Sequence, residues 1–318
     1  MEFLPIIDPA SADASECIDR ACREVGFFAV PLPDRLAQAR VELLDLAAAF
    51  FARPDIDKAR SSMERGGHAW RGWFPLDGEL TSGAPDHKEG YYFGTELPPD
   101  PRAMHGPNLW PDEPAALRPA VTEWMREMEE LGQRLLSAMA AGLGLAADFF
   151  ARGLTAAPTC LFRIFRYPPH PQRATASWGV GEHTDYGLLT LLATDGTPGL
   201  EVKSRGEWHA VAADAGLVVG NLGDMLDRLT GGRYRSNAHR VRNHADHDRY
   251  SLPFFLDPGW DASVAPLEFD DGWVTPLDTA ERWDRADLRH LDTMYATYGD
   301  YLTAKTARVF PHLPPPRT

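Results

Sequence analysis

The sequence His183-Thr-Asp-Tyr-Gly-Leu-Leu-Thr-Leu-Leu-Ala193 joins two polar side chains to an apolar run typical of a buried β-strand. His183 and Asp185 are two residues apart, a spacing that places both side chains on one face of an extended backbone. The polar pair therefore stands at the edge of a core. The imidazole of His183 and the carboxylate of Asp185 are therefore predicted to lie side by side, where both can bind a metal ion.

The His-x-Asp spacing alone is a weak signal, because it occurs twice more in the chain. His244-Ala-Asp246 lies in a polar run, and we interpret it as a solvated turn between strands. His290-Leu-Asp292 lies on a predicted helix, where residues two apart face different directions. Neither of these two pairs is expected to bind metal.

A third ligand for the first pair is predicted at His239, which begins another short strand, His239 to Val241. Two imidazoles and one carboxylate form the facial arrangement that non-haem Fe(II) uses, with positions left open for O₂ and a cosubstrate. The competing interpretation of any single histidine is an ordinary core or surface residue. The joint pattern favours a metal site.

Arg249-Tyr-Ser251 opens the apolar strand that runs to Leu256. Arg249 and Ser251 share a face of that strand, so a guanidinium and a hydroxyl can converge on one carboxylate. This is what a dicarboxylate cosubstrate needs in an apolar pocket. A surface arginine at the end of a strand is the alternative.

The surrounding pattern predicts a mixed α and β protein. Helical spacing of apolar residues occurs at 11–23, 36–51 and 115–141 around a short strand at 26–30, and a last helical stretch covers 288–306. Short strands separated by turn residues are predicted at 159–167, 187–193, 200–202, 208–211, 217–220, 239–241 and 250–256. We therefore expect a single domain, 1–318, with a mainly helical part at 1–155, a β-sandwich or jelly-roll core at about 156–260, and a helical part to 318.

Composition narrows the functional classes. The 318 residues include 32 basic and 46 acidic ones, a net charge of −14 that argues against a nucleic-acid-binding face. Three cysteines without metal-finger spacing indicate reduced thiols and a cytoplasmic protein. We expect no signal peptide, because the N-terminus lacks a basic start followed by a long apolar run. We expect no membrane span, because no uninterrupted apolar run of about 18 residues occurs. The sequence leaves the oligomeric state open.

Further motifs surround these residues, among them Arg166-Tyr-Pro-Pro169, Gly199-Leu-Glu-Val202, Val219-Gly-Asn-Leu-Gly-Asp224 and, more loosely, Pro5-Ile-Ile-Asp8, Gly26-Phe-Phe28 and Asp86-x-Lys-Glu89. Together with His183-Thr-Asp185, His239 and Arg249-x-Ser251, they resemble the Fe(II)/2-oxoglutarate oxygenases of the isopenicillin N synthase-like family. The resemblance spans most of the chain. Phe165-Arg166 departs from the usual Asn-Tyr before the Tyr-Pro-Pro segment.

The resemblance implies a distorted double-stranded β-helix (jelly roll) core flanked by helices. It implies that Fe(II) is held by His183, Asp185 and His239, and that 2-oxoglutarate is held by Arg249 and Ser251 with Tyr167. Such an enzyme uses O₂ to oxidise a C–H bond of a small molecule, hydroxylation being the default, and releases succinate and CO₂. Asp185 argues against halogenation, because related halogenases have Gly or Ala there.

Three alternatives stay open at this point: a related Fe(II) oxidase that does not use 2-oxoglutarate, a non-catalytic metal-binding sensor on the same fold, and a Zn²⁺ hydrolase. By resemblance, the N-terminal segment, the strands facing iron and the C-terminal helix line the substrate pocket. The candidate residues are His68, Trp70, Arg71, Trp73, Tyr91, Tyr92 and Phe255. Core packing is the competing interpretation for each aromatic residue, and a surface salt bridge is the competing one for Arg71.

Overall fold

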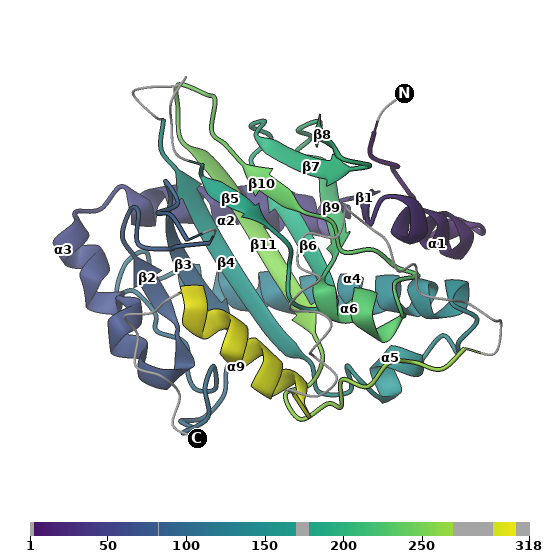
Figure 1. Ribbon diagram of the computed structural model, residues 1–318. Coiled ribbons are helices and arrows are strands. Elements are labelled where there is room, and N and C mark those ends of the chain that lie inside the picture. The colour runs from purple at the N-terminus through teal and green to yellow at the C-terminus, as the bar shows by residue number, and fades with distance from the viewer. Residues whose placement is uncertain (1–2, 82, 170–177, 270–294, 310–318) are drawn as a thin grey trace.

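The computed structural model describes residues 3–81, 83–169, 178–269 and 295–309, which build two antiparallel β-sheets and the helices around them (Figure 1). The large sheet has the order β1 (Phe27–Pro31), β9 (Leu217–Leu222), β6 (Leu189–Thr194), β11 (Arg249–Asp257), β4 (Thr159–Tyr167), β3 (Glu89–Gly94) and β2 (Gly72–Phe74). The small sheet has the order β5 (Val180–His183), β10 (His239–Val241), β7 (Leu200–Ser204) and β8 (Glu207–Ala210). The two sheets form the jelly-roll core that the sequence predicts.

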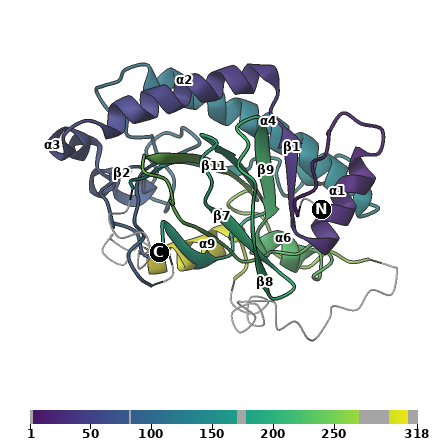
Figure 2. The same ribbon diagram turned by 90° about the horizontal axis from the view of Figure 1, so that it is seen from above.

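Helices cover the large sheet on the side away from the small one. Figure 2 shows α2 (Asp34–Phe51) and α4 (Leu117–Gly142) on that side, while α9 (Tyr298–Val309) lies on the side of the small sheet. The remaining helices are α1 (Ala14–Glu24), the short α3 (Asp55–Lys58), α5 (Phe149–Arg152) and α6 (Asp224–Leu229), and the 3₁₀ turns η1 (Ala59–Ser61) and η2 (Met63–Ala69). None of the described helices combines the length and the apolar character that a membrane crossing needs.

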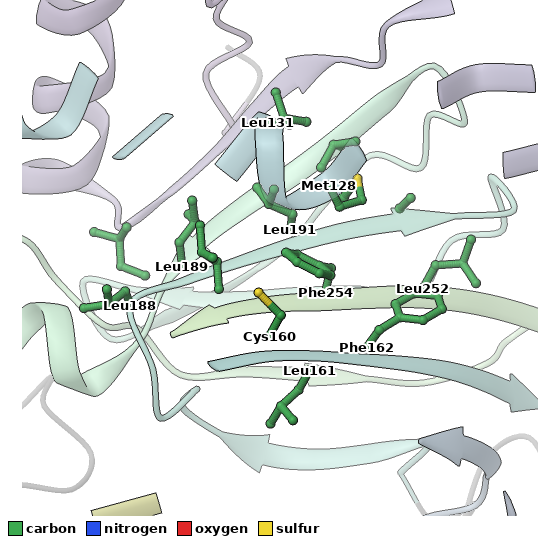
Figure 3. Packing of buried hydrophobic residues seen from close by; sticks show 14 of the residues in the cluster. Met128, Leu131, Cys160, Leu161, Phe162, Leu188, Leu189, Leu191, Leu252 and Phe254 are labelled. Carbon is green, nitrogen blue, oxygen red and sulfur yellow. The ribbon is translucent and has the colours of Figure 1, made fainter. Parts of the chain in front are cut away.

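Alternation along β4 separates the helix-covered core from a cavity between the sheets. Cys160 and Phe162 lie on the side of Met128 of α4, and Leu161 points the opposite way (Figure 3). The odd-numbered residues of β4 from Leu161 to Tyr167 all line the cavity. On β11 the odd-numbered residues from Arg249 to Asp257 line it too. Because side chains of a strand alternate, the two neighbouring strands give one face to the core and the other to the cavity.

The predicted strands of the second half are present, and β4 and β10 have the predicted bounds. The description of the first half as mainly helical is incomplete, because β2 and β3 extend the large sheet. All six residues of β3 are buried, so its sequence lacks the alternation of apolar and polar residues by which a strand is predicted. β5 was not predicted either, because its sequence Val-Gly-Glu-His contains a single residue with high strand propensity. Of the last predicted helix, residues 288–294 lie outside the described residues.

Candidate functional site

Two imidazoles face each other across neighbouring strands of the small sheet. His183 ends β5, His239 begins β10, and the two residues are partners in the antiparallel register. Their ring centres are 4.2 Å apart. The Nδ1 atom of His183 lies 2.8 Å from the carbonyl oxygen of Gly181, and that of His239 lies 3.3 Å from the carbonyl oxygen of Asn237. The Nδ1 atoms contact these carbonyls, which leaves both Nε2 atoms available to a metal ion.

The carboxylate of Asp185, just after β5, completes the group. Its Oδ1 atom is 3.8 Å from Nε2 of His183 and 3.8 Å from Nε2 of His239. Its Oδ2 atom accepts hydrogen bonds from Thr190 Oγ1 at 2.5 Å and Asn221 Nδ2 at 2.7 Å. Thr190 of β6 and Asn221 of β9 belong to the large sheet, so that sheet orients the carboxylate and the small sheet carries the imidazoles.

The protonation states suit metal binding. Burial, followed by the proximity of His239, lowers the pKa of His183 to about 3, so this imidazole is neutral at neutral pH. Burial alone would raise the pKa of Asp185, but the imidazoles of His239 and His183 and the two hydrogen bonds lower it below its usual value. Neutral imidazole and ionised carboxylate are the metal-binding forms. The ligand atoms of the three residues lie within 4.8 Å of one another.

A buried cation lies in the wall of the same cavity. The Arg249 side chain is buried, its Nε donates to the carbonyl oxygen of Thr197 at 3.1 Å, and its Nη1 has no hydrogen-bond partner among the described residues. Its guanidinium lies 5.0 Å from the ring centre of Tyr167, whose hydroxyl is 3.1 Å from Ser251 Oγ. A buried charge with an unused donor needs an anionic partner. A carboxylate of a cosubstrate fits this place.

Of the predicted substrate contacts, the structure brings Phe255 to the cavity. The other candidates lie around β2, β3 and η2, where His68 is half-buried and the rest are buried. Among the described residues they do not line the cavity: His68, Trp70, Arg71, Trp73, Tyr91 and Tyr92.

Several of their polar atoms form hydrogen bonds there, whereas His68 Nδ1, Trp70 Nε1 and Arg71 Nε have no partner among the described residues. Arg71 Nη2 donates to the carbonyl oxygen of Met104 at 2.9 Å, and the hydroxyl of Tyr91 donates to the carbonyl oxygen of Leu109 at 2.8 Å. The hydroxyl of Tyr92 donates to Glu79, which does line the cavity. Tyr92 therefore contacts a residue of the cavity wall without lining the cavity itself. Core packing, the competing interpretation for the aromatic residues, describes Trp70, Trp73, Tyr91 and Tyr92, whereas Arg71 is buried and is not the surface residue of its own competing interpretation.

The cavity is also lined by charged and polar residues that the sequence did not indicate as site residues, notably Lys88, Arg163 and Tyr186. Arg163 was recognisable in principle, because it lies four residues before Tyr167 on the same face of β4. Lys88 lies in the quoted segment Asp86-x-Lys-Glu89 and forms ion pairs with Glu79 and Asp86, both at 2.8 Å. No pattern in the sequence around Lys88 indicates that this segment reaches the cavity.

The other two His-x-Asp pairs do not join the metal group. The side chain of Asp246 is 83% exposed in the loop before β11, where it contacts His247, as expected for a solvated turn. The pair His290 and Asp292 lies outside the described residues.

A jelly roll with two imidazoles and one carboxylate at the mouth of an apolar cavity defines the class of non-haem iron enzymes. Residues 158–258 match the 2OG-Fe(II) oxygenase superfamily, and residues 3–113 match the N-terminal region of non-haem dioxygenases in morphine synthesis. The chain therefore belongs to the 2OG-Fe(II) oxygenase superfamily.

Individual proteins agree with this assignment. A Dictyostelium discoideum protein named a probable iron/ascorbate oxidoreductase is 35% identical over 98% of this chain and 96% of its own length. A 2-oxoglutarate-dependent dioxygenase of Penicillium crustosum is 33% identical over 82% of each chain. A solved structure from Caulobacter crescentus that carries the 2OG-Fe(II) oxygenase family name has a TM-score of 0.80 and 28% identity, and covers 97% of this chain and 99% of its own.

The prediction of the family, of the jelly-roll fold and of the cofactors Fe(II), 2-oxoglutarate and O₂ is confirmed. The protein is an Fe(II)- and 2-oxoglutarate-dependent oxygenase that oxidises a C–H bond of a small molecule, with release of succinate and CO₂.

Proposed function

We propose that His183, Asp185 and His239 are the iron ligands of this oxygenase. The observation that carries the proposal is the convergence of one atom from each residue within 4.8 Å at the cavity. When bound, Fe(II) supplies the redox chemistry with O₂ and 2-oxoglutarate that oxidises the substrate C–H bond. Thr190 and Asn221 orient the Asp185 carboxylate through their hydrogen bonds to Oδ2, which leaves Oδ1 for the metal.

We propose that Arg249, Ser251 and Tyr167 bind the distal carboxylate of 2-oxoglutarate. The buried Nη1 of Arg249 lacks a partner among the described residues, and the two hydroxyls lie beside the same face of the cavity. Leu192, Leu200 and Val241 also line the cavity. These apolar side chains exclude water, which strengthens an ion pair formed there.

We propose further that Phe255 contacts the substrate, since it is the predicted substrate residue that lines the cavity among the described part of the chain. One domain over 1–318 is supported by the large sheet, in which β1 pairs with β9 and β3 with β4. We also propose that the protein acts in the cytoplasm on a small molecule and does not bind nucleic acid. The three free cysteines support the location, and the net charge of −14 supports the absence of nucleic-acid binding.

The assay is succinate formation from 2-oxoglutarate under air, with Fe(II) binding measured separately without O₂. His183→Ala and His239→Ala should lose both Fe(II) binding and succinate formation while keeping the circular dichroism of the wild type. His244→Ala, in the solvated loop, is the matched control and should behave as wild type. Full succinate formation by either ligand variant would show that iron is held elsewhere. Absence of turnover in an iron-loaded wild type would instead favour the metal-binding sensor.

A further inference from the structure

A second cation, Arg163 on β4, lines the cavity, and its ion-pair partner Glu79 lies 4.0 Å away, beyond hydrogen-bond distance. Its guanidinium lies 4.2 Å from the ring centre of Tyr92, its cross-strand neighbour, and 4.7 Å from that of Phe255. Its Nε is buried and has no hydrogen-bond partner among the described residues. The two rings occupy ring-stacking positions beside the guanidinium, so its N–H edge is the part available to a ligand.

The neighbouring charges are already paired. Glu79 approaches Arg163 only to 4.0 Å, whereas it lies 2.8 Å from Lys88 and accepts a hydrogen bond from the hydroxyl of Tyr92. Lys88 is also paired with Asp86 at 2.8 Å. Glu79 and Asp86 thus balance the charges of Lys88 and Arg163 in number, but Glu79 is too far from Arg163 to accept a hydrogen bond from it. A partly desolvated cation of this kind favours an anion.

Arg163 and Arg249 start from different points along the cavity wall. Arg249 is the register partner of Tyr167 at the end of β4, and Arg163 lies four residues earlier on that strand. Two positions four residues apart on an antiparallel strand are separated by roughly 14 Å. Because the bases of the two side chains are this far apart and the cosubstrate is assigned to Arg249, Arg163 is the cation that we assign to a different ligand.

We propose that Arg163 binds a carboxylate of the substrate, and that the molecule oxidised by this enzyme is a small acid. This inference rests on the proposed function of the site, because it assigns the second cation to the substrate. The edge of a guanidinium presents parallel N–H donors that match the two oxygens of a carboxylate. Phe255, Leu161 and Tyr186 line the cavity around Arg163 and receive the apolar part of the acid.

The test compares acids with their neutral derivatives. The probes are phenylacetate, cinnamate and octanoate, each with its methyl ester and primary amide. They are titrated without O₂ into enzyme saturated with Fe(II) and 2-oxoglutarate, so that acids cannot occupy the cosubstrate site. At least one acid should bind ten times or more as tightly as its ester and amide.

Arg163→Met should weaken binding of that acid about ten- to hundredfold, the loss of one charge-assisted contact, and leave binding of the ester within about twofold. Arg163→Lys keeps the positive charge but loses the paired N–H donors of the guanidinium, so it should retain part of the preference for the acid over its ester. Arg166→Met is the matched control on the same strand, because Arg166 pairs with Glu89 and Asp248 and does not line the cavity. It should leave the preference for the acid intact. Thermal melting excludes unfolding of each variant.

Equal binding of acids and esters by the wild type, no binding of any acid, or full acid binding by Arg163→Met would overturn the proposal. Binding of 2-oxoglutarate alone is measured first in every variant. If the wild type fails to bind 2-oxoglutarate, the proposed function fails, and the preference of the metal-free protein for acid over ester still tests Arg163.

Discussion

Asn221 should control iron affinity although it is not a ligand. Its Nδ2 donates to Asp185 Oδ2 at 2.7 Å, and the amide is buried in β9. Asn221→Ala removes this bond and leaves Thr190 as the remaining donor to that oxygen among the described residues. The carboxylate can then rotate, so that Oδ1 is no longer held towards both imidazoles.

The size of the effect follows from the charge on the acceptor. A hydrogen bond to a charged group contributes about 1.5–3 kcal/mol, and about 1.4 kcal/mol corresponds to a tenfold change in an equilibrium constant. Loss of a group that orients a metal ligand weakens metal binding about 10–100-fold. Because Thr190 still holds the same oxygen, we expect the Kd for Fe(II) to rise about tenfold.

The assay is an anaerobic Fe(II) titration in competition with a chelator of known affinity. Asn108→Ala is the matched control, because this buried asparagine also loses hydrogen bonds, to Gly94 and Glu96, outside the cavity wall. The control should lose stability but keep its affinity for Fe(II). An unchanged Kd in Asn221→Ala, or an equal loss in Asn108→Ala, would refute the reasoning that the large sheet orients the ligand.

Four further outcomes are expected. Asp185→Gly should bind Fe(II) weakly and form no succinate, whereas Asp246→Gly in the exposed loop should match the wild type; the reverse result in the succinate assay would move the metal site. Arg249→Ala should weaken 2-oxoglutarate binding by about one to two orders of magnitude in a titration with Fe(II) present, and an unchanged affinity would contradict its role. Gly187→Ala should lower the free energy of unfolding in urea by about 1–3 kcal/mol, because the added Cβ would lie 1.4 Å from Oδ1 of Asp257. Full stability would show that the segment around Gly187 and the end of β11, which carries Asp257, move apart at little cost. Burial raises the pKa of the Asp257 carboxyl to about 7, so the folded protein holds this proton more tightly than the unfolded chain; its stabilising contribution is therefore greatest at acidic pH and is lost as pH rises through about 7. Unfolding from pH 4 to 8 should show that the free energy of the wild type falls relative to that of Asp257→Asn, and parallel curves would contradict the shift.

The sequence by itself determined the elements that rest on local patterns. β4 and β10 have the predicted bounds because turn residues flank runs with strand periodicity. The histidines and the aspartate could be chosen because their spacing and the apolar run after them are visible in the chain. The choice of Arg249 and Ser251 as candidate ligands of a carboxylate followed from the period of a strand, which puts residues two apart on one face.

Only the tertiary structure decided which side chains reach the cavity. Tyr91 and Tyr92 were predicted to contact the substrate, but β3 is buried on both faces, so its aromatic residues pack in the core. Thr190 and Asn221 meet Asp185 because β6 and β9 are neighbours in the large sheet, a pairing that no local pattern specifies. Arg163 of β4 and Glu79, in the loop between β2 and β3, lie 84 residues apart in the chain (163 − 79), yet the fold brings them to 4.0 Å. Local periodicity sets the face of a strand, whereas the pairing of distant strands decides what that face meets.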